Sequence, residues 1–264
     1  MKIRLDKALV ERGLAGSRER AQALVIAGRV LVGDQKVEKP GTPVEEDSAL
    51  RVIGADLRYV SRGGLKLERS LEYWQIKLEG RLCVDVGAST GGFTDCMLQH
   101  GAASVLAIDT GYGQIAHSLR IDPRVKLMER RNARLLESAE LLVVSSQLSV
   151  EGGVAGAAIS FLAMDVSFIS ATLVLPAVLR ALVAEGEAWR GEAVVLIKPQ
   201  FEAGREHVGK GGIVRERLGR EIAIARVKEC VAELGGTGVE VIDSPITGME
   251  GNREYLLHAW FDAR

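Results

Sequence analysis

After about residue 80, short runs of apolar residues alternate with longer stretches of helical character. The runs predict β-strands at 82–86, 104–109, 125–129, 158–165, 193–198, 238–243 and 255–261. Helices are expected between most of them, including one at 92–100 and an apolar one at 171–184. This alternation predicts the α/β class, with a mostly parallel sheet that has helices on both faces.

The first 54 residues show a different pattern, with shorter elements. A helix from Leu5 should end at Gly13, and a second should begin after the N-cap Ser17 and stop at Gly28. Short strands are expected at 30–32, near Val37 and at 50–53, with a rigid loop at 39–43. We therefore predict a small α+β domain at 1–54, a linker at 55–60 and a large domain at 61–264.

Composition adds a local charge asymmetry to this picture. The 264 residues are 47% hydrophobic with a net charge of −1, so the chain can bury a large core and is not basic overall. Residues 1–39, however, hold nine Lys or Arg against five acids. A nucleic acid would have to bind such a patch, and its candidate contacts are Arg4, Lys7, Arg18, Arg20 and Arg29.

The cysteines and the apolar runs exclude several classes of protein. Cys83, Cys96 and Cys230 are few, odd in number and far apart, which argues against a disulfide framework and a cysteine zinc site. We expect no metal. No apolar run reaches the length of a membrane span, and the first residues do not resemble a secretory signal. The cytoplasm is the expected location, without a membrane partner.

A glycine-rich turn joins the strand at 82–86 to the following helix and is the candidate cofactor site. Its residues are Asp85, Gly87, Ser89, Gly91, Gly92 and Phe93. Amide groups at a helix start favour a negative group, but Ser89 stands where a dinucleotide fold needs glycine to admit pyrophosphate. The pattern is similar to the first motif of S-adenosylmethionine-dependent methyltransferases. Asp109, 24 positions after Asp85, is placed to bind ribose hydroxyls, and Asn132 matches a position that often holds the adenine edge.

Four charged residues lie beside recognisable landmarks further along the chain: Lys66, Asp165, Lys198 and Glu254. They occur in Ser61-Arg62-Gly63-Gly64-Leu65-Lys66-Leu67, Met164-Asp165-Val166-Ser167-Phe168, Leu196-Ile197-Lys198-Pro199-Gln200-Phe201-Glu202 and Gly251-Asn252-Arg253-Glu254-Tyr255. With the glycine-rich turn, these segments resemble the FtsJ-type methyltransferases and their Lys-Asp-Lys-Glu tetrad. The basic front end resembles the S4 RNA-binding module, and the whole chain resembles the TlyA family, often labelled haemolysin A.

This resemblance implies a Rossmann-like methyltransferase sheet and a specific activity. Members of the family are ribosomal RNA 2′-O-methyltransferases, so the expected cofactor is S-adenosylmethionine and the expected partner is ribosomal RNA in a ribosomal subunit. Cytidine is the expected target. Arg62 and Lys66 are further candidate RNA contacts. The oligomeric state and the exact nucleotide do not follow from the resemblance.

The chemistry of methyl transfer also assigns roles to the four charged residues. A sulfonium makes its methyl group electrophilic without a metal, whereas a ribose hydroxyl needs a group that draws its proton away. Lys198 is the expected base, because Lys66 and the sulfonium favour its neutral form. Asp165 and Glu254 favour its charged form, so a charged Lys198 that positions the hydroxyl, with Asp165 as the proton acceptor, stays open. Glu254 is expected to fix the geometry of the lysines.

Other functions stay open at this stage. The family label suggests a membrane-active haemolysin, for which alanine at Lys198 should leave lysis intact. An RNA-binding module with a degenerate cofactor pocket should give no saturable binding of S-adenosylmethionine, and a nicotinamide oxidoreductase is a further alternative. Residues 200–217 are either an RNA-facing loop or a glycine-rich surface connection.

Overall fold

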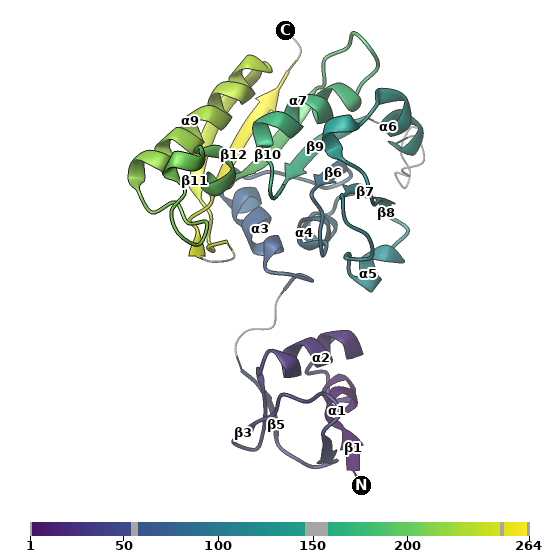
Figure 1. The fold of residues 1–264 in the computed structure, drawn as a ribbon. Helices are drawn as coiled ribbons and strands as arrows, with labels where there is room; N and C mark the ends of the chain where they lie inside the picture. The colour runs from purple at the N-terminus through teal and green to yellow at the C-terminus, as the bar shows by residue number, and fades with distance from the viewer. Residues whose placement is uncertain (1, 54–57, 146–157, 249–250, 263–264) are drawn as a thin grey trace. The chain divides into compact units, whose positions relative to one another are not determined.

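The computed structural model describes residues 2–53, 58–145, 158–248 and 251–262. Its contacts divide the chain into two compact units, Met1–Arg58 and Tyr59–Arg264 (Figure 1). Of the linker predicted at 55–60, residues 55–57 lie outside the described residues. Each unit is described by itself below.

The first unit packs two helices against small antiparallel sheets. Its elements are β1 (Lys2–Arg4), α1 (Leu5–Glu11), α2 (Arg18–Ile26), β2 (Val30–Val32), β3 (Gln35–Lys36), β4 (Pro43–Glu45) and β5 (Leu50–Val52). The predicted N-cap is confirmed, because the Ser17 hydroxyl accepts a hydrogen bond from the Arg20 amide at 3.2 Å. Leu5, Leu9 and Val25 are fully buried in its core.

Two strands of this unit, β1 and β4, were not predicted from the sequence. The prediction of a loop ending at residue 43 is wrong at its last residue, because Pro43–Glu45 forms β4 and pairs antiparallel with β1. β1 and β4 have only three residues each, which is too short for an alternating pattern of apolar and polar residues to be visible. Proline fits at the first residue of such an edge strand, where no ladder hydrogen bond from its nitrogen is needed.

The second unit contains a seven-stranded sheet in the order β11-β12-β10-β9-β6-β7-β8. The strands are β6 (Leu82–Val86), β7 (Ser104–Ile108), β8 (Val125–Met128), β9 (Ile159–Met164), β10 (Gly191–Ile197), β11 (Gly236–Asp243) and β12 (Tyr255–Phe261). The predicted strands are confirmed to within two residues at each end. β12 runs antiparallel to β10 and β11, while the other neighbouring pairs are parallel.

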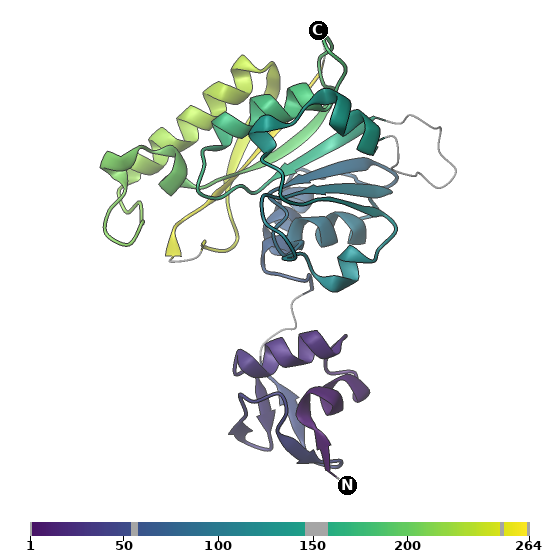
Figure 2. The ribbon, with the colours of Figure 1, turned by 45° about the vertical axis from the view of Figure 1, so that its right-hand side comes forward.

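Helices cover both faces of this sheet, as Figure 2 shows. They are α3 (Gly63–Tyr73), α4 (Gly92–Gln99), α5 (His117–Arg120), α6 (Ser138–Ser145), α7 (Ala171–Ala181), α8 (Pro199–Glu202) and α9 (Arg217–Glu233), with 3₁₀ turns η1 (Ala133–Leu135) and η2 (Arg205–His207). Because both faces are covered, every side chain of β6 and β7 is buried, and these strands appear as continuous apolar runs rather than alternating ones.

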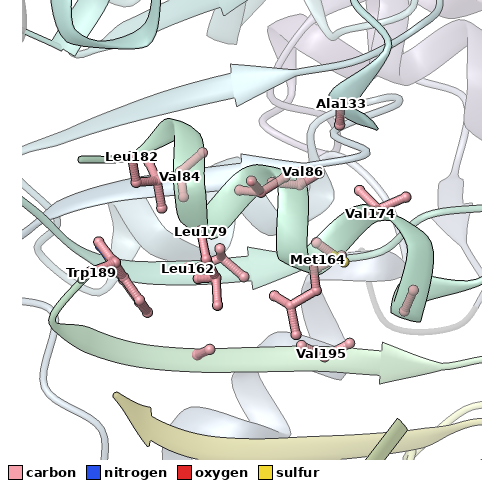
Figure 3. Packing of buried hydrophobic residues seen from close by; sticks show 14 of the residues in the cluster. Val84, Val86, Ala133, Leu162, Met164, Val174, Leu179, Leu182, Trp189 and Val195 are labelled. Carbon is pink, nitrogen blue, oxygen red and sulfur yellow. The ribbon is translucent and has the colours of Figure 1, made fainter. Parts of the chain in front are cut away.

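Two apolar clusters lie on opposite sides of the sheet. In the cluster of Figure 3, Val84, Leu162 and Val195 of the central strands pack against residues of α7 such as Val174. In the other cluster, Leu67 of α3 and other apolar residues of α3 and α4 pack against the remaining face. Each fully buried aliphatic side chain contributes about 1.5–3 kcal/mol. This packing makes the sheet a rigid base for the residues at its strand ends.

Proline inside α7 has a local compensation. Pro176 has no amide hydrogen, so the carbonyl of Thr172 one turn earlier loses its helical partner. The Cys230 thiol of α9 lies 3.8 Å from that carbonyl oxygen and donates to it. The helix continues past the proline to Ala181.

Candidate active site

A cavity of about 590 Å³ lies where the carboxyl ends of the central strands meet. Its walls come from the segments that follow β6, β9 and β10, from the start of α3 and from the segment before β12. The lining residues include Arg62, Lys66, Gly87, Ser89, Gly92, Phe93, Asp165, Ser167, Phe168, Lys198, Gln200, Phe201 and Glu254. The cavity thus contains all four of the charged residues that the sequence singled out.

Strand pairing explains why these four residues meet. Ile197 of β10 pairs with Tyr255 of the antiparallel β12, so Lys198 and Glu254 both flank this pair at the same edge of the sheet. Asp165 follows β9 in the same way, and its amide donates to the Val86 carbonyl at 2.9 Å. The tertiary fold therefore gathers residues that are far apart along the chain.

The charged groups form a continuous chain of ion pairs. Lys66 Nζ lies 2.6 Å from Glu254 Oε2 and 3.8 Å from Asp165 Oδ2, and Lys198 Nζ lies 2.5 Å from Asp165 Oδ1. The side chains are between 3% and 19% exposed. Two cations balance two carboxylates, which lowers the cost of burying them and fixes their geometry.

Ser167 extends this chain and was not singled out by the sequence. Lys198 Nζ donates to the Ser167 hydroxyl oxygen at 2.6 Å, so its ammonium is held between a carboxylate and a hydroxyl. Ser167 stands two residues after Asp165 in a segment that the analysis quoted for Asp165 alone. Only the approach of β10 to the end of β9 reveals its contact.

Glycines of the turn after β6 permit close packing of the chain. Gly87 has a φ of +88°, and a Cβ there would lie 2.4 Å from the Asp165 carbonyl oxygen. A Cβ at Gly92 would lie 2.3 Å from the Ser61 hydroxyl oxygen. Both glycines therefore bring the turn against neighbouring segments, and Ser89 between them adopts a positive φ of 50°.

Two of the candidate cofactor residues, Asp85 and Gly91, make close contacts within the protein. Asp85 and Gly91 are not among the described residues that line the cavity. Asp85 is fully buried, and its Oδ2 accepts hydrogen bonds from the amide and the hydroxyl of Thr94 at 2.9 and 2.6 Å. Burial raises the pKa of this carboxyl to about 7. Gly91 has a φ of +94°, which side chains rarely adopt, and a Cβ there would lie 2.3 Å from Leu119 Cδ1, so a substitution at this position would be strained.

Asp109 lies next to a second, smaller cavity of about 10 Å³, which shares Ala88 and Ser89 with the first. Its carboxylate accepts hydrogen bonds from the amides of Ser89 at 2.8 Å and Gly111 at 2.6 Å. Gln114 also lines this space, which has room for about one water molecule. A nucleoside could enter only if these side chains rearranged.

Asn132 has a different place from the other candidates. It is exposed, and its side-chain oxygen caps η1 by accepting from the Arg134 amide at 3.1 Å. It is not among the described residues that line either cavity. Its predicted contact with adenine stays a prediction.

The candidate RNA contacts of the first unit are partly held by ion pairs. Arg4 and Arg18 lie 2.9 and 3.1 Å from Oδ2 of the buried Asp6. The Arg4 guanidinium holds the pKa of the Asp6 carboxyl well below its usual range. Lys7 pairs with Glu11 at 3.5 Å. The two arginines remain about half exposed, so they are oriented by Asp6 and can still meet a phosphate.

The other candidate RNA contacts lie elsewhere. Arg20 of α2 is half-buried, and Arg29 after α2 donates to the Ile53 carbonyl at 3.1 Å. Arg62 directly precedes α3 and lines the large cavity. The sequence analysis proposed these residues as RNA contacts, and those contacts stay predictions.

Asn252 was quoted from the sequence without a role, and the structure gives it one. It is 2% exposed, its Oδ1 accepts from the Val214 amide at 3.0 Å, and its Nδ2 donates to the Gly212 carbonyl at 2.8 Å. It therefore attaches the basic loop, defined here as residues 203–215, to the segment that carries Glu254. Gly212 of this loop lines the cavity.

An exposed aromatic residue stands at the cavity. Phe168 is 93% exposed and has a positive φ of 63°, a conformation that costs a bulky residue free energy. Its ring centroid lies 5.5 Å from that of Phe201. Strain of this kind collects at functional sites, where the surrounding structure enforces it.

The described residues contain neither a candidate metal site nor a candidate membrane span. Within the described ranges, no three His, Cys, Asp or Glu side chains are grouped so that they could hold a metal ion. Across the same ranges, no helix combines the length and the apolar character needed to cross a membrane. All three cysteines are free thiols.

Comparison with known proteins relates both units to described families. Residues 59–261 match the family of FtsJ-like methyltransferases, and residues 3–50 match the S4 domain. The chain is 44% identical to a candidate rRNA methyltransferase of Bacillus subtilis, over 97% of this chain and 85% of that protein. It is 42% identical to a 16S/23S rRNA (cytidine-2′-O)-methyltransferase, TlyA, of Mycobacterium tuberculosis, over 97% of this chain and 89% of that one.

A solved structure also resembles the whole chain. A candidate hemolysin from Streptococcus thermophilus superposes with a TM-score of 0.70 at 40% identity, over 99% of this chain and 90% of that one. Related proteins of this kind therefore carry both methyltransferase and hemolysin names.

Proposed function

Since the chain belongs to the FtsJ-like methyltransferase family and carries an S4 domain, we propose that it methylates a ribose 2′-hydroxyl of ribosomal RNA, with S-adenosylmethionine as the donor. We propose cytidine as the target, because the name of the Mycobacterium tuberculosis relative specifies it. The observation that carries the proposal is the convergence of Lys66, Asp165, Lys198 and Glu254 in one cavity.

Three features of the cavity support its fit to the cofactor. Its volume is within the usual range of small-molecule sites. The start of α4, with Gly92 and Phe93, presents backbone amides that suit a carboxylate group. Gly87 and Ser89 form the wall between this helix start and Asp165. When bound, S-adenosylmethionine supplies an electrophilic methyl group on a positive sulfur.

The chain's own residues would supply proton removal and orientation. As the new O–CH₃ bond forms, the O–H bond of the 2′-hydroxyl breaks and its proton goes to Lys198 Nζ or to an oxygen of Asp165. These groups are 2.5 Å apart, so a proton accepted by one can be shared with the other. Glu254 holds Lys66 beside Asp165, which keeps the proton acceptor in a fixed orientation.

Substitution of Lys198 tests the reaction. Wild type and Lys198→Ala would be incubated with labelled donor and with isolated small and large ribosomal subunits, and linkages that resist alkaline cleavage would be mapped. We expect an alkali-resistant linkage after a cytidine, lost in the variant. Lys228→Ala, which removes an exposed lysine of α9, is the matched control and should keep activity. Methylation on a base, or full activity of the Lys198→Ala variant, would contradict the proposal.

Lys198→Arg separates the two proton routes. Arginine keeps the positive charge but does not release a proton at ordinary pH. If Lys198 is the base, Lys198→Arg should be as inactive as the alanine variant. If Lys198 only positions the hydroxyl, part of the activity should remain, and Asp165→Asn should be the more damaging change.

The S4 unit would supply affinity for the RNA backbone. Its arginines and lysines suit phosphates, so binding to ribosomal subunits should weaken as salt increases. Saturable binding of S-adenosylmethionine in a calorimetric titration would separate the enzyme from an RNA-binding module with a degenerate pocket. We also propose a cytoplasmic location, which the free thiols support.

A further inference from the structure

Among the described residues, none donates a hydrogen bond to the side-chain oxygen of Gln200. This oxygen, Oε1, is shielded from solvent. An amide oxygen buried without a partner is unfavourable, and such atoms are rare in folded proteins. The Gln200 side chain also lines the large cavity. A small rotation of the amide would therefore offer this oxygen to a ligand.

The sheet order places Gln200 in the half of the cavity that faces away from the glycine-rich turn. The turn follows β6, whereas Gln200 lies in α8 after β10, and β9 separates the two strands. Asp165, at the end of β9, and Lys198, just before α8, stand between them. A nucleotide whose 2′-oxygen lies at the tetrad therefore has Gln200 on the side away from the glycine-rich turn.

An aromatic surface accompanies the amide. Phe201, the next residue, contacts Phe168 with ring centroids 5.5 Å apart, and the Phe168 ring is almost fully exposed. Both rings belong to residues that line the cavity. Flat apolar surfaces beside a polar amide suit a nucleobase, because the base can stack while its edge is read by hydrogen bonds.

We infer that Gln200 determines base specificity by accepting a hydrogen bond from the exocyclic amino group of the target nucleotide. This inference rests on the proposed function and deepens it. Cytosine presents its N4 amino group as a donor where uracil presents an oxygen acceptor. A glutamine oxygen held toward that edge therefore favours cytidine over uridine at the methylated position.

The test measures kcat/KM for methyl transfer to subunits that carry either the natural cytidine or a uridine at the mapped target. Gln200→Met keeps the length of the side chain but removes the acceptor. We expect it to lose about 10- to 100-fold in kcat/KM on the cytidine substrate, the usual effect of one lost hydrogen bond to a buried group, with little change on the uridine substrate. The preference for cytidine should collapse.

Gln200→Glu and Gln99→Leu are the companion variants. Glutamate has acceptors and no donor, so it should retain cytidine methylation within a few fold and reject uridine more strongly than wild type. Gln99 is an exposed residue at the end of α4, and its substitution should leave both rates unchanged. Thermal unfolding checks that each variant is folded.

The cofactor provides the alternative donor, because S-adenosylmethionine also carries an amino group. Calorimetric titration with the cofactor distinguishes the two sources. An unchanged Kd in Gln200→Met supports the base contact. A Kd weakened by the same factor as kcat/KM, or an unchanged preference for cytidine over uridine, overturns the inference. If the wild type transfers no methyl group to RNA, the proposed function and this inference fail together.

Discussion

Replacement of Asp85 by asparagine should change how the stability of the second unit depends on pH. The carboxyl is fully buried, its Oδ2 accepts two hydrogen bonds from Thr94, and its Oδ1 meets no partner among the described groups. Asparagine keeps the size of the side chain and an oxygen that can accept from Thr94. It has no carboxyl group to titrate.

The size and sign of the effect follow from the raised pKa. Burial raises the pKa of Asp85 to about 7, against 3.8 for the ordinary group. Between these two values the native state keeps its proton and the unfolded state loses it, so the free energy of unfolding falls as pH rises. The slope is about 1.4 kcal/mol per pH unit, so the loss reaches about 4 kcal/mol by pH 7 and then stops.

The assay is urea unfolding followed by tryptophan fluorescence at several values between pH 4 and pH 8. Trp74, Trp189 and Trp260 all belong to the second unit, so the signal reports on that unit. Other carboxyl groups titrate alike in both proteins and cancel in the difference. We expect the stability of Asp85→Asn relative to wild type to increase from pH 4 to pH 7. A difference that stays constant over this range would refute a protonated, buried Asp85.

Two further predictions concern the tetrad and the basic loop. Lys66→Met should lower the free energy of unfolding by about 3–5 kcal/mol, because it leaves Glu254 buried without its cation, and Lys66→Met/Glu254→Gln should recover part of this loss in the same urea assay. An additive double variant would contradict the coupling. Asn252→Ala should raise KM for ribosomal subunits while leaving the Kd for the cofactor unchanged, because the basic loop loses both of its hydrogen bonds to Asn252. Equal KM values for wild type and variant would show that the loop has no part in RNA binding.

The order of strands and helices in the second unit could be predicted from the sequence because its pattern is local. β6 and β7 are continuous apolar runs, and the glycine-rich turn marks where a strand passes into a helix. In the first unit, β1 (Lys-Ile-Arg) and β4 (Pro-Val-Glu) escaped prediction because they are short and lack the apolar run that marks β2 (Val-Leu-Val). Their pairing depends on residues about 40 positions apart.

Some features of the site could likewise be predicted from the sequence, and others could not. The tetrad residues were found from their motifs, yet Ser167, Gln200 and Asn252 stood in those motifs without a role. Asp85 was expected at the cofactor from its motif, and the structure adds that it is buried and accepts two hydrogen bonds from Thr94. Its contact with a cofactor stays a prediction. Residue type indicates what a side chain can bind, whereas its orientation depends on what surrounds it.

The sequence by itself determined the family, the two-part organisation of elements and the identity of the four charged residues, because these depend on residue type and spacing along the chain. Only the tertiary structure decided that the four form one series of ion pairs and that, within the described ranges, the Gln200 oxygen at the cavity has no donor. The physical reason is that strand order and register set distances between residues far apart in sequence. Burial and hydrogen bonding depend on those distances.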